Sequence, residues 1–569
     1  MQKLPSCARI MVLQNFMPLP IAPPLPTQGK PTAYWNSCQG SLLSLSLANT
    51  VQQQPSPLLI ITEDLHQATQ IANELHFFLA DSDLPIIIFP DWETLPYDIF
   101  SPLPELVSQR LLTLQQIRSL SKGIVIVAIP TLMQRILPAS FLDAHSLVLK
   151  TGQILDLDTF RRNLQQAGYQ CVSQVMQHGE FAVRGSLIDL FPMGSDTPLR
   201  IDLFDNEIDS LRTFEVETQR TQEKTEAIHL LPAREFPLDQ TAIKRFRAAW
   251  REYFTGDPKN SLIYRDISEQ AIPSGIEYYL PLFHEHTATL FDYLPSNTLL
   301  AYAQSLTDES RQFFQQIQER YEQRRYDIER PLLAPDSLYV TPEELDTALD
   351  TFPCIVHQAN QQPQGYHFDK QLLPPMHLQA RAADPAVGLR HFLTQHTGRT
   401  LFVAETAGRR ETLLETLHGL TIRPQVVDGW QAFLQADSDC CLTIAPLEQG
   451  LWLNEPAIAL LPEALLLGER VKQRRRQRKA IDADLIIRNL AELSIGAPVV
   501  HEEHGVGRYL GLQTLDVGGL CTEFLTLEYA KQDKLYVPVS SLHFISRYTG
   551  ASAENAPLHR LGSDQWEKA

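Results

Sequence analysis

Short apolar runs alternate with amphipathic helical stretches early in the chain. This alternation is the feature that most limits the folds that the chain can adopt. The runs PLLII, LPIIIF and GIVIVAI read as strands, and helical patterns at residues 64–79 and 104–120 separate them. In the first helical stretch, Leu65, Ala68, Ala72 and Leu75 share one face. Apolar strands that alternate with amphipathic helices indicate a parallel sheet, so we predict an α/β domain here.

The pattern changes near residue 140. Residues 199–214 alternate apolar and polar side chains on both sides of Asp205-Asn206-Glu207, which is typical of a β-hairpin. A second α/β pattern occupies about 340–465, and residues 497–547 contain short strands with glycine and polar turns, which favour a small barrel.

These patterns predict a multidomain α/β protein of roughly four domains. A proline-rich leader precedes a parallel α/β domain, which an α+β insert interrupts. A small α/β domain, a basic linker and the barrel follow, and a helix that begins near Ser563 suggests a longer protein. The predicted boundaries are 1–31 for the leader, 32–139 and 215–339 for the first domain, and 140–214 for the insert. The small α/β domain would occupy 340–465, the basic linker 466–489, the barrel 490–550 and the start of the last helix 551–569.

The stretch YWNSCQGSLLSLSLANT, residues 34–50, has the loop-then-helix form of a nucleotide-binding loop. It holds one glycine, and the chain has no lysine between Lys30 and Lys122. A working phosphate loop needs several close backbone N–H groups and a lysine for the phosphates. We therefore predict an ordinary loop or the remnant of a lost ATP site, at Gly40, Ser41, Leu42 and Leu43.

Composition excludes several classes of protein. The net charge of −19 and pI near 5.4 argue against a general nucleic-acid coat, because phosphate binding needs clustered Lys and Arg. The seven cysteines are scattered without CxxC spacing, so we expect neither a disulfide framework nor a metal site. Free cysteines fit a reducing compartment, so we expect a cytoplasmic location. No run of about 18 apolar residues is present, so no membrane span is expected.

Two polar motifs have competing readings. Seven of the ten residues 470–479 are basic, so this run is either a solvated linker helix or a phosphate contact through Arg474, Arg475, Arg476 and Arg478. His501 and His504 bracket two glutamates, one residue short of the spacing that puts two metal-binding histidines on one helix face. We therefore expect a polar edge strand there, with the two histidines on opposite faces.

Several stretches resemble the bacterial transcription-repair coupling factor family, known as Mfd. They follow one another in the order of the family and span nearly the whole chain. The stretches are DWETLPYD at 91–98, HGEFAVRGSLIDLFPMGS at 178–195, DNEIDSLRTFEVETQRT at 205–221, PSGIEYYLPLF at 273–283, VVHEEHGVGRYLG at 499–511 and KLYVPVSSLHFISRY at 534–548.

The resemblance implies a fold for each predicted domain. The first would be a degenerate RecA-like domain of the UvrB type, in which the family has lost the phosphate loop. A third α/β domain would precede a Tudor-like, CarD-like barrel. An ATP-driven DNA translocase, with its ATP and Mg²⁺, would belong to a part absent from this chain. This chain would therefore contain no catalytic residue, cofactor site or metal site.

The resemblance also implies two protein partners. The insert would bind UvrA through Gln170, Glu180, Phe181 and Arg184, although Gln170 and Ala182 replace arginines that the family or UvrB can offer. The barrel would bind the β subunit of RNA polymerase through a free strand edge, which we predict to be Val499, Val500, His501, Glu502, Glu503 and His504. The strand around Lys534 to Pro538 is the next candidate, because the order of the strands cannot be derived from the sequence.

The implied function is transcription-coupled nucleotide excision repair. In that role the chain would be a monomeric adaptor that binds stalled polymerase and recruits UvrA. Double-stranded DNA would be contacted mainly by the absent translocase. The alternative is a CarD-like transcription regulator with an inactive UvrB-like module, but about 470 residues precede the barrel and argue against it.

Overall fold

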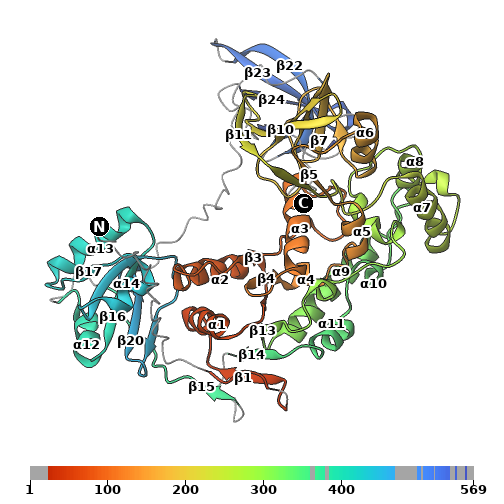
Figure 1. Ribbon diagram of the computed structural model, residues 1–569. Coiled ribbons are helices and arrows are strands. Elements are labelled where there is room, and N and C mark those ends of the chain that lie inside the picture. Colours follow the sequence, from red (N-terminus) through yellow and green to blue (C-terminus); the bar gives the residue numbers. More distant parts are fainter. Residues whose placement is uncertain are drawn as a thin grey trace, which may run out of the picture.

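The computed structural model (Figure 1) describes residues 23–27, 29–358, 365–378, 384–467, 496–501, 504–517, 520–538, 545–547, 556, 558 and 559. Within these ranges the strands form four large sheets and one small two-stranded sheet. The basic run at 470–479 and the expected helix near Ser563 lie outside the described residues.

The first domain is built on a seven-stranded parallel sheet with the order β15-β1-β14-β13-β2-β4-β3. All side chains of β2 and β4 are buried, which explains their unbroken apolar sequences. The predicted alternation of strands and helices is confirmed. The elements are β1 (Thr32–Asn36), α1 (Ser41–Gln53), β2 (Leu58–Thr62), α2 (Leu65–Phe78), β3 (Ile86–Ile88), α3 (Pro104–Arg118), β4 (Ile124–Ala128), β13 (Leu299–Ala303), β14 (Cys354–Gln358) and β15 (Tyr366–His367).

The sheet extends past the boundary expected at residue 339. Strand β14 lies between β1 and β13, and β15 forms the edge of the sheet, so both belong to the first domain. The sequence could not reveal this, because an apolar strand carries no mark of which sheet it will join.

The insert contains a six-stranded sheet with the order β11-β10-β9-β8-β7-β6, packed against α6 (Leu157–Gln166). The predicted hairpin is confirmed: β9 and β10 pair across Asp205, whose φ of 55° suits a tight turn. The strands are β6 (Gln170–Cys171), β7 (Glu180–Arg184), β8 (Leu187–Leu190), β9 (Leu199–Phe204), β10 (Glu207–Phe214) and β11 (Thr221–Thr225).

The insert also runs further than the expected boundary at residue 214. Strand β11 pairs with β10, and β12 (Ala227–Leu230) returns to pair with β5 (Leu147–Lys150) at the entry to the domain. The β5–β12 pair therefore brings together the two segments of chain that connect the insert to the first domain.

Helices and aromatic side chains fill the region after the insert. α7 (Gln240–Tyr253), α8 (Leu262–Ser268), the 3-10 helix η2 (Ile276–Leu282) and α9 (Leu306–Arg324) surround a core rich in Trp, Tyr and Phe. Two shorter helices, α10 (Pro335–Leu338) and α11 (Pro342–Leu349), lead back to β14.

The second α/β domain has a five-stranded sheet with the order β17-β18-β16-β20-β19, parallel except at β19. It shares one hydrophobic core with the first domain. Helix α14 lies beside α2 (Figure 1). Trp430 on α14 packs edge-on against Phe78 on α2, with ring centroids 5.1 Å apart. The elements are α12 (Val387–Gln395), β16 (Arg399–Ala404), α13 (Ala407–Gly419), β17 (Gln425–Val426), α14 (Gly429–Gln435), β18 (Cys440–Ile444), β19 (Leu451–Leu453), β20 (Ile458–Pro462) and α15 (Glu463–Leu467).

The carboxyl-terminal unit, here called the sheet domain, is a five-stranded antiparallel sheet with the order β24-β23-β22-β21-β25. Strands β24 and β25 are its edges among the described residues, so closure into a barrel stays a prediction. The strands are β21 (Pro498–His501), β22 (Gly505–Val517), β23 (Leu520–Glu528), β24 (Lys534–Pro538) and β25 (Ile545–Arg547).

A buried ion pair fixes α3 against the segment that follows the insert. Arg110 is fully buried, and its Nε lies 2.7 Å from Oε1 of Glu235, which also accepts a hydrogen bond from the Trp92 indole at 3.2 Å. The guanidinium lies over the rings of Phe89 and Trp92. Removing one partner would leave the other charge buried and uncompensated.

We expect Arg110→Met to lower the free energy of unfolding by about 3–5 kcal/mol, because Glu235 would lose its counter-charge. The matched control is Arg118→Met on the same helix, whose partner Asp143 is largely exposed; its cost should be below about 1 kcal/mol. Urea titration followed by tryptophan fluorescence measures both. Equal losses for the two variants would contradict the assignment.

Candidate docking sites

The loop between β1 and α1 has the geometry that the sequence suggested. The chain leaves the sheet at Asn36, passes Ser37 and Gly40 with φ of 56° and 57°, and enters α1 at Ser41. Strand, loop and helix therefore follow one another at the carboxyl end of a parallel strand, where ligands bind in many α/β folds.

A residue of the second α/β domain covers this loop. Gln449, between β18 and β19, accepts a hydrogen bond at its backbone oxygen from Ser41 Oγ at 2.8 Å. A Cβ on Gly40 would collide with the Gln449 side chain. Every residue of α1 from Ser41 to Val51 is buried. Gln449 therefore lies directly against Gly40 and Ser41, at the N-terminus of α1.

A buried acid lies against the same helix. Glu74 on α2 is only 1% exposed, and burial raises its pKa from 4.5 to about 6. The negative charge of Glu448 adds to this rise, whereas hydrogen bonds involving Ser44 and Gln70 oppose it. A carboxylate in this position would repel a bound phosphate.

In the insert, the expected UvrA-binding residues divide into exposed and buried ones. Gln170 and Arg184 are exposed, and Glu180 is half-buried. Phe181 is fully buried and packs in the same core as Phe160 and Leu164 of α6. Its ring is therefore not exposed in this fold, and a direct contact of Phe181 with a partner stays a prediction.

Both faces of β7 are covered, which the sequence did not reveal. Phe181 faces the large core that includes α6, whereas Ala182 lies in a smaller cluster with Val175, Phe191 and Phe214. Arg184 comes after this covered part, next to the tight turn at Gly185. Its side chain is exposed there, and its Nη2 donates a hydrogen bond to the Ser173 carbonyl at 2.7 Å.

Glu180 organises the loop that leads into β7. Its carboxylate accepts hydrogen bonds from the backbone amides of Met176 and Gln177 at 2.7 and 2.9 Å. These bonds give Glu180 a structural role that holds independently of any partner.

Gln170 and Glu180 are opposite each other in the β6–β7 pair and line a groove of about 930 Å³ between the insert and the first domain. Arg184 does not line this groove. Arg162 and Arg234 do, together with Glu277, and sequence reasoning missed all three because each is an isolated charge without a motif. Burial raises the pKa of Glu277 to about 7, against the opposing effects of the Ser101 hydrogen bond and the Arg234 charge.

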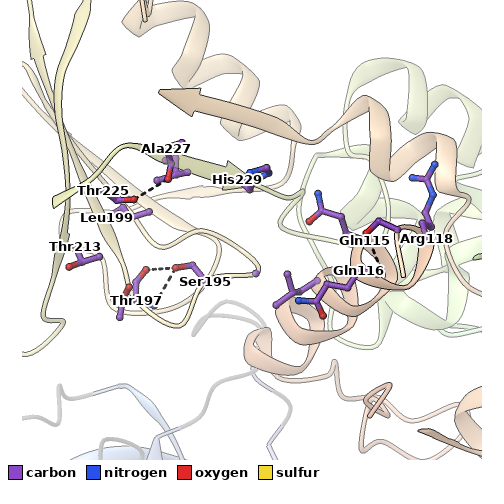
Figure 2. A pocket seen from close by; sticks show the side chains of 14 residues that line it. Gln115, Gln116, Arg118, Ser195, Thr197, Leu199, Thr213, Thr225, Ala227 and His229 are labelled. Atoms are coloured by element: carbon purple, nitrogen blue, oxygen red, sulfur yellow. Dashed lines mark hydrogen bonds between the residues drawn. The ribbon is translucent and has the colours of Figure 1, made fainter. Parts of the chain in front are cut away.

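A second hollow of about 940 Å³ lies between α3 and the strands of the insert (Figure 2). Gln115, Gln116 and Arg118 approach it from the helix, and Thr225 and His229 from the other side. None of its 14 described lining residues is acidic. Its amides and hydroxyls offer hydrogen bonds but no catalytic constellation.

In the sheet domain, β21 is not the free edge that we expected. Val499, Val500 and His501 pair with β22 on one side and with β25 on the other. Strand β24 has β23 as its neighbour and forms the edge of the described sheet, with Tyr536 40% exposed. Strand order depends on tertiary contacts, which explains why the sequence did not settle it.

The two histidines of this region lie together instead of on opposite faces. The rings of His501 and His504 stack with centroids 4.7 Å apart, and the strand that ends at His501 pairs antiparallel with the one that begins at Gly505. Glu502 and Glu503 lie outside the described residues, as do Arg474, Arg475, Arg476 and Arg478. In the part of the chain that the structure describes, no three His, Cys, Asp or Glu side chains form a metal cluster.

Comparison with known protein families gives three matches along the chain. Residues 147–236 match the UvrB interaction domain, residues 392–466 the MFD D3 domain, and residues 493–549 the CarD-like/TRCF RID domain. The first range covers the sheet of the insert, including the strands beyond residue 214. The other two cover most of the second α/β domain and the sheet domain.

Curated relatives match over nearly the whole chain. The transcription-repair-coupling factor of Haemophilus influenzae is 44% identical over 96% of this chain and 48% of its own length. That of Escherichia coli K12 is 45% identical over 93% and 46%, and that of Bacillus subtilis 168 is 26% identical over 93% and 46%. The chain thus spans about half the length of the curated relatives it matches.

The matched domains define a multidomain protein that combines a UvrB-type interaction domain with a CarD-like domain. Along almost all of its length the chain is similar to transcription-repair-coupling factors, at 44 and 45% identity over about half of their length. Among the residues that the structure describes, none of the helices has the length and apolar character needed to span a bilayer.

The buried Glu74 predicts a pH dependence of stability. Its folded pKa is raised, so the native state binds a proton more tightly than the unfolded chain does, and stability falls as pH rises from about 4.5 to about 6. Glu74→Gln should remove this slope and raise the free energy of unfolding at pH 7 by on the order of 2 kcal/mol. Thermal unfolding between pH 5 and 8 measures the effect. Asp81→Asn, an exposed acid just beyond the same helix, is the control, and an unchanged slope in Glu74→Gln would contradict the assignment.

Proposed function

We propose that this chain is the adaptor region of a transcription-repair-coupling factor. In the cytoplasm it would bind RNA polymerase stalled at a lesion and recruit UvrA for nucleotide excision repair, acting as a monomer. The observation that carries the proposal is the presence, in one chain, of a UvrB interaction domain, an MFD D3 domain and a CarD-like/TRCF RID domain.

We further propose that the chain itself hydrolyses nothing. The loop at Gly40 and Ser41 is covered by Gln449, lacks a lysine, and has the buried acid Glu74 beside its helix. ATP-driven translocation on double-stranded DNA would be the activity of the longer relatives. It would require ATP, Mg²⁺ and residues beyond the domains matched in this chain.

The alternative, a CarD-like transcription regulator, is less well supported. A regulator of that kind would need only the sheet domain. The relatives instead match over 93 to 96% of the chain, and the MFD D3 domain lies within that match.

For UvrA, the proposed contact is centred on Arg184, with Glu180 at the other end of the same strand, β7, and Gln170 on the adjacent strand β6. Arg184 is exposed at the end of β7, and its guanidinium can donate several hydrogen bonds in fixed geometry. Arginine is among the residues most often found at the energetic centre of protein interfaces.

Arg184→Ala should weaken UvrA binding about 30-fold or more, as is typical for the loss of an interface hot spot. Arg161→Ala, an exposed arginine on α6 of the same domain, is the control and should change affinity less than twofold. Calorimetry with purified UvrA measures both variants. Circular dichroism must show an unchanged fold, and parent-like affinity of Arg184→Ala would exclude this assignment.

For RNA polymerase, we propose that the sheet domain docks by adding a strand to its partner. Such docking needs a free row of main-chain N–H and C=O groups. Among the described residues, strand β24 has a neighbour on one side only, whereas Val499 to His501 are paired on both sides. The half-exposed His504 and its neighbours Glu502 and Glu503 stay candidates for a contact at the β21–β22 turn.

Two variants separate these candidate surfaces. Tyr536→Ala on β24 should lower the affinity for the polymerase β subunit about tenfold or more, because aromatic side chains often anchor such contacts. Glu502→Arg tests the turn, and Gln513→Ala, exposed on the internal strand β22, is the control. Biolayer interferometry at fixed salt measures all three. Loss in Glu502→Arg alone would move the contact to the turn, and no loss in either would contradict docking by this domain.

A further inference from the structure

The segment between β3 and α3, residues 92–102, is held rigidly although it contains no helix or strand. Its backbone carbonyls are bound by side chains from distant parts of the chain. Tyr278 Oη donates to the Leu95 carbonyl at 2.6 Å, Arg320 Nε to that of Pro96 at 2.8 Å, and Arg324 Nη1 to that of Tyr97 at 2.7 Å. We call this segment the platform loop.

The backbone of the platform loop is also strained, and such strain persists only where the surrounding structure holds the backbone in place. Glu93 and Tyr97 have φ of 56° and 60°, in the left-handed region that costs free energy for side chains other than glycine. Gly275 approaches so closely that a Cβ there would lie 2.9 Å from the Asp98 carbonyl oxygen. Ser101 Oγ adds a hydrogen bond to Glu277 Oε2 at 2.7 Å.

This rigid loop presents the half-buried ring of Phe100. The ring stacks on the imidazole of His559, with centroids 5.5 Å apart and planes inclined by 25°. The two residues are 459 positions apart, and His559 follows the last strand of the sheet domain.

His559 is bound firmly to the sheet domain. Its backbone N–H donates to the Val506 carbonyl at 3.0 Å, and its carbonyl accepts from the Ala530 N–H at 2.9 Å. Its Nδ1 accepts a third hydrogen bond, from the Val506 N–H at 2.8 Å. With 7% of its surface exposed, His559 is a buried link between β22 and the platform loop.

We propose that the platform loop is a docking surface for the sheet domain, and that the Phe100–His559 stack holds that domain against the first domain. The occupant is His559 of the same chain, together with the strand β22 to which it is hydrogen-bonded. The rigidity of the loop keeps the Phe100 ring oriented before contact, which reduces the entropy lost on docking. The inference does not depend on the proposed function, because it concerns contacts within the chain.

The test is hydrogen–deuterium exchange on the full chain. Phe100→Ala removes the stack and keeps every group that forms the hydrogen bonds between His559 and Val506. If docking protects these hydrogen bonds, the peptides containing Val506 and Ala530 should exchange about tenfold faster in Phe100→Ala than in the parent chain. The reason is that an aromatic pair contributes up to roughly one power of ten in equilibrium constant. Leu95→Ala, 39% exposed on the same loop, is the control and should leave both peptides unchanged.

Two variants of His559 separate the ring stack from the hydrogen bond. His559→Phe keeps a ring for stacking and removes the Nδ1 acceptor, whereas His559→Asn keeps a polar group and removes the ring. Docking predicts that small-angle scattering shows an increased radius of gyration for Phe100→Ala and His559→Asn but a smaller change for His559→Phe. Peptides of β16 report on global folding and should not change.

One outcome would overturn the proposal. If the Val506 peptide responds to the His559 variants but not to Phe100→Ala, and the radius of gyration stays constant in all of them, His559 only stabilises the sheet domain internally. The platform loop would then not be a docking surface.

Discussion

The hydrophobic contact between α1 and α2 of the first domain and the second α/β domain organises much of this protein. Trp430 packs against Phe77 and Phe78, and the two sheets contribute to one continuous core. Because apolar burial is the main favourable term in folding, two domains that share a core are stabilised together. The same contact brings Gln449 onto Ser41, and so determines what the loop after β1 can bind.

This contact also determines which groups surround the start of α1. The α1 helix is buried from its first turn, its N-terminal hydroxyl binds a protein carbonyl, and a carboxyl lies beside it. A helix N-terminus normally favours anions through its exposed N–H groups and dipole. Here, neighbouring protein groups occupy that position, and the strand–loop–helix unit serves as packing surface between domains.

The surfaces proposed for partners lie on different structural units. Arg184 is on the sheet of the insert, whereas β24 is an edge of the described part of the sheet domain. The insert packs in a core shared with the first domain and the sheet domain in a separate one, so one surface can be altered without loss of the other. The contact between Phe100 and His559 is then a direct physical connection between the sheet domain and the first domain.

The sequence by itself determined the local secondary structure and the absence of a phosphate-binding lysine in the loop after Tyr34. Apolar runs such as residues 57–61 could only be buried strands between helices, the Asp205 turn made a hairpin, and the loop after Tyr34 lacked a lysine whatever its shape. Tertiary structure alone decided strand order and burial. It put β14 in the first sheet, paired β21 on both sides, and buried Phe181 beneath α6 while leaving Arg184 exposed. These outcomes depend on contacts between residues far apart in the chain, and the periodicity of a segment reports only which side chains share a face, not what that face will meet.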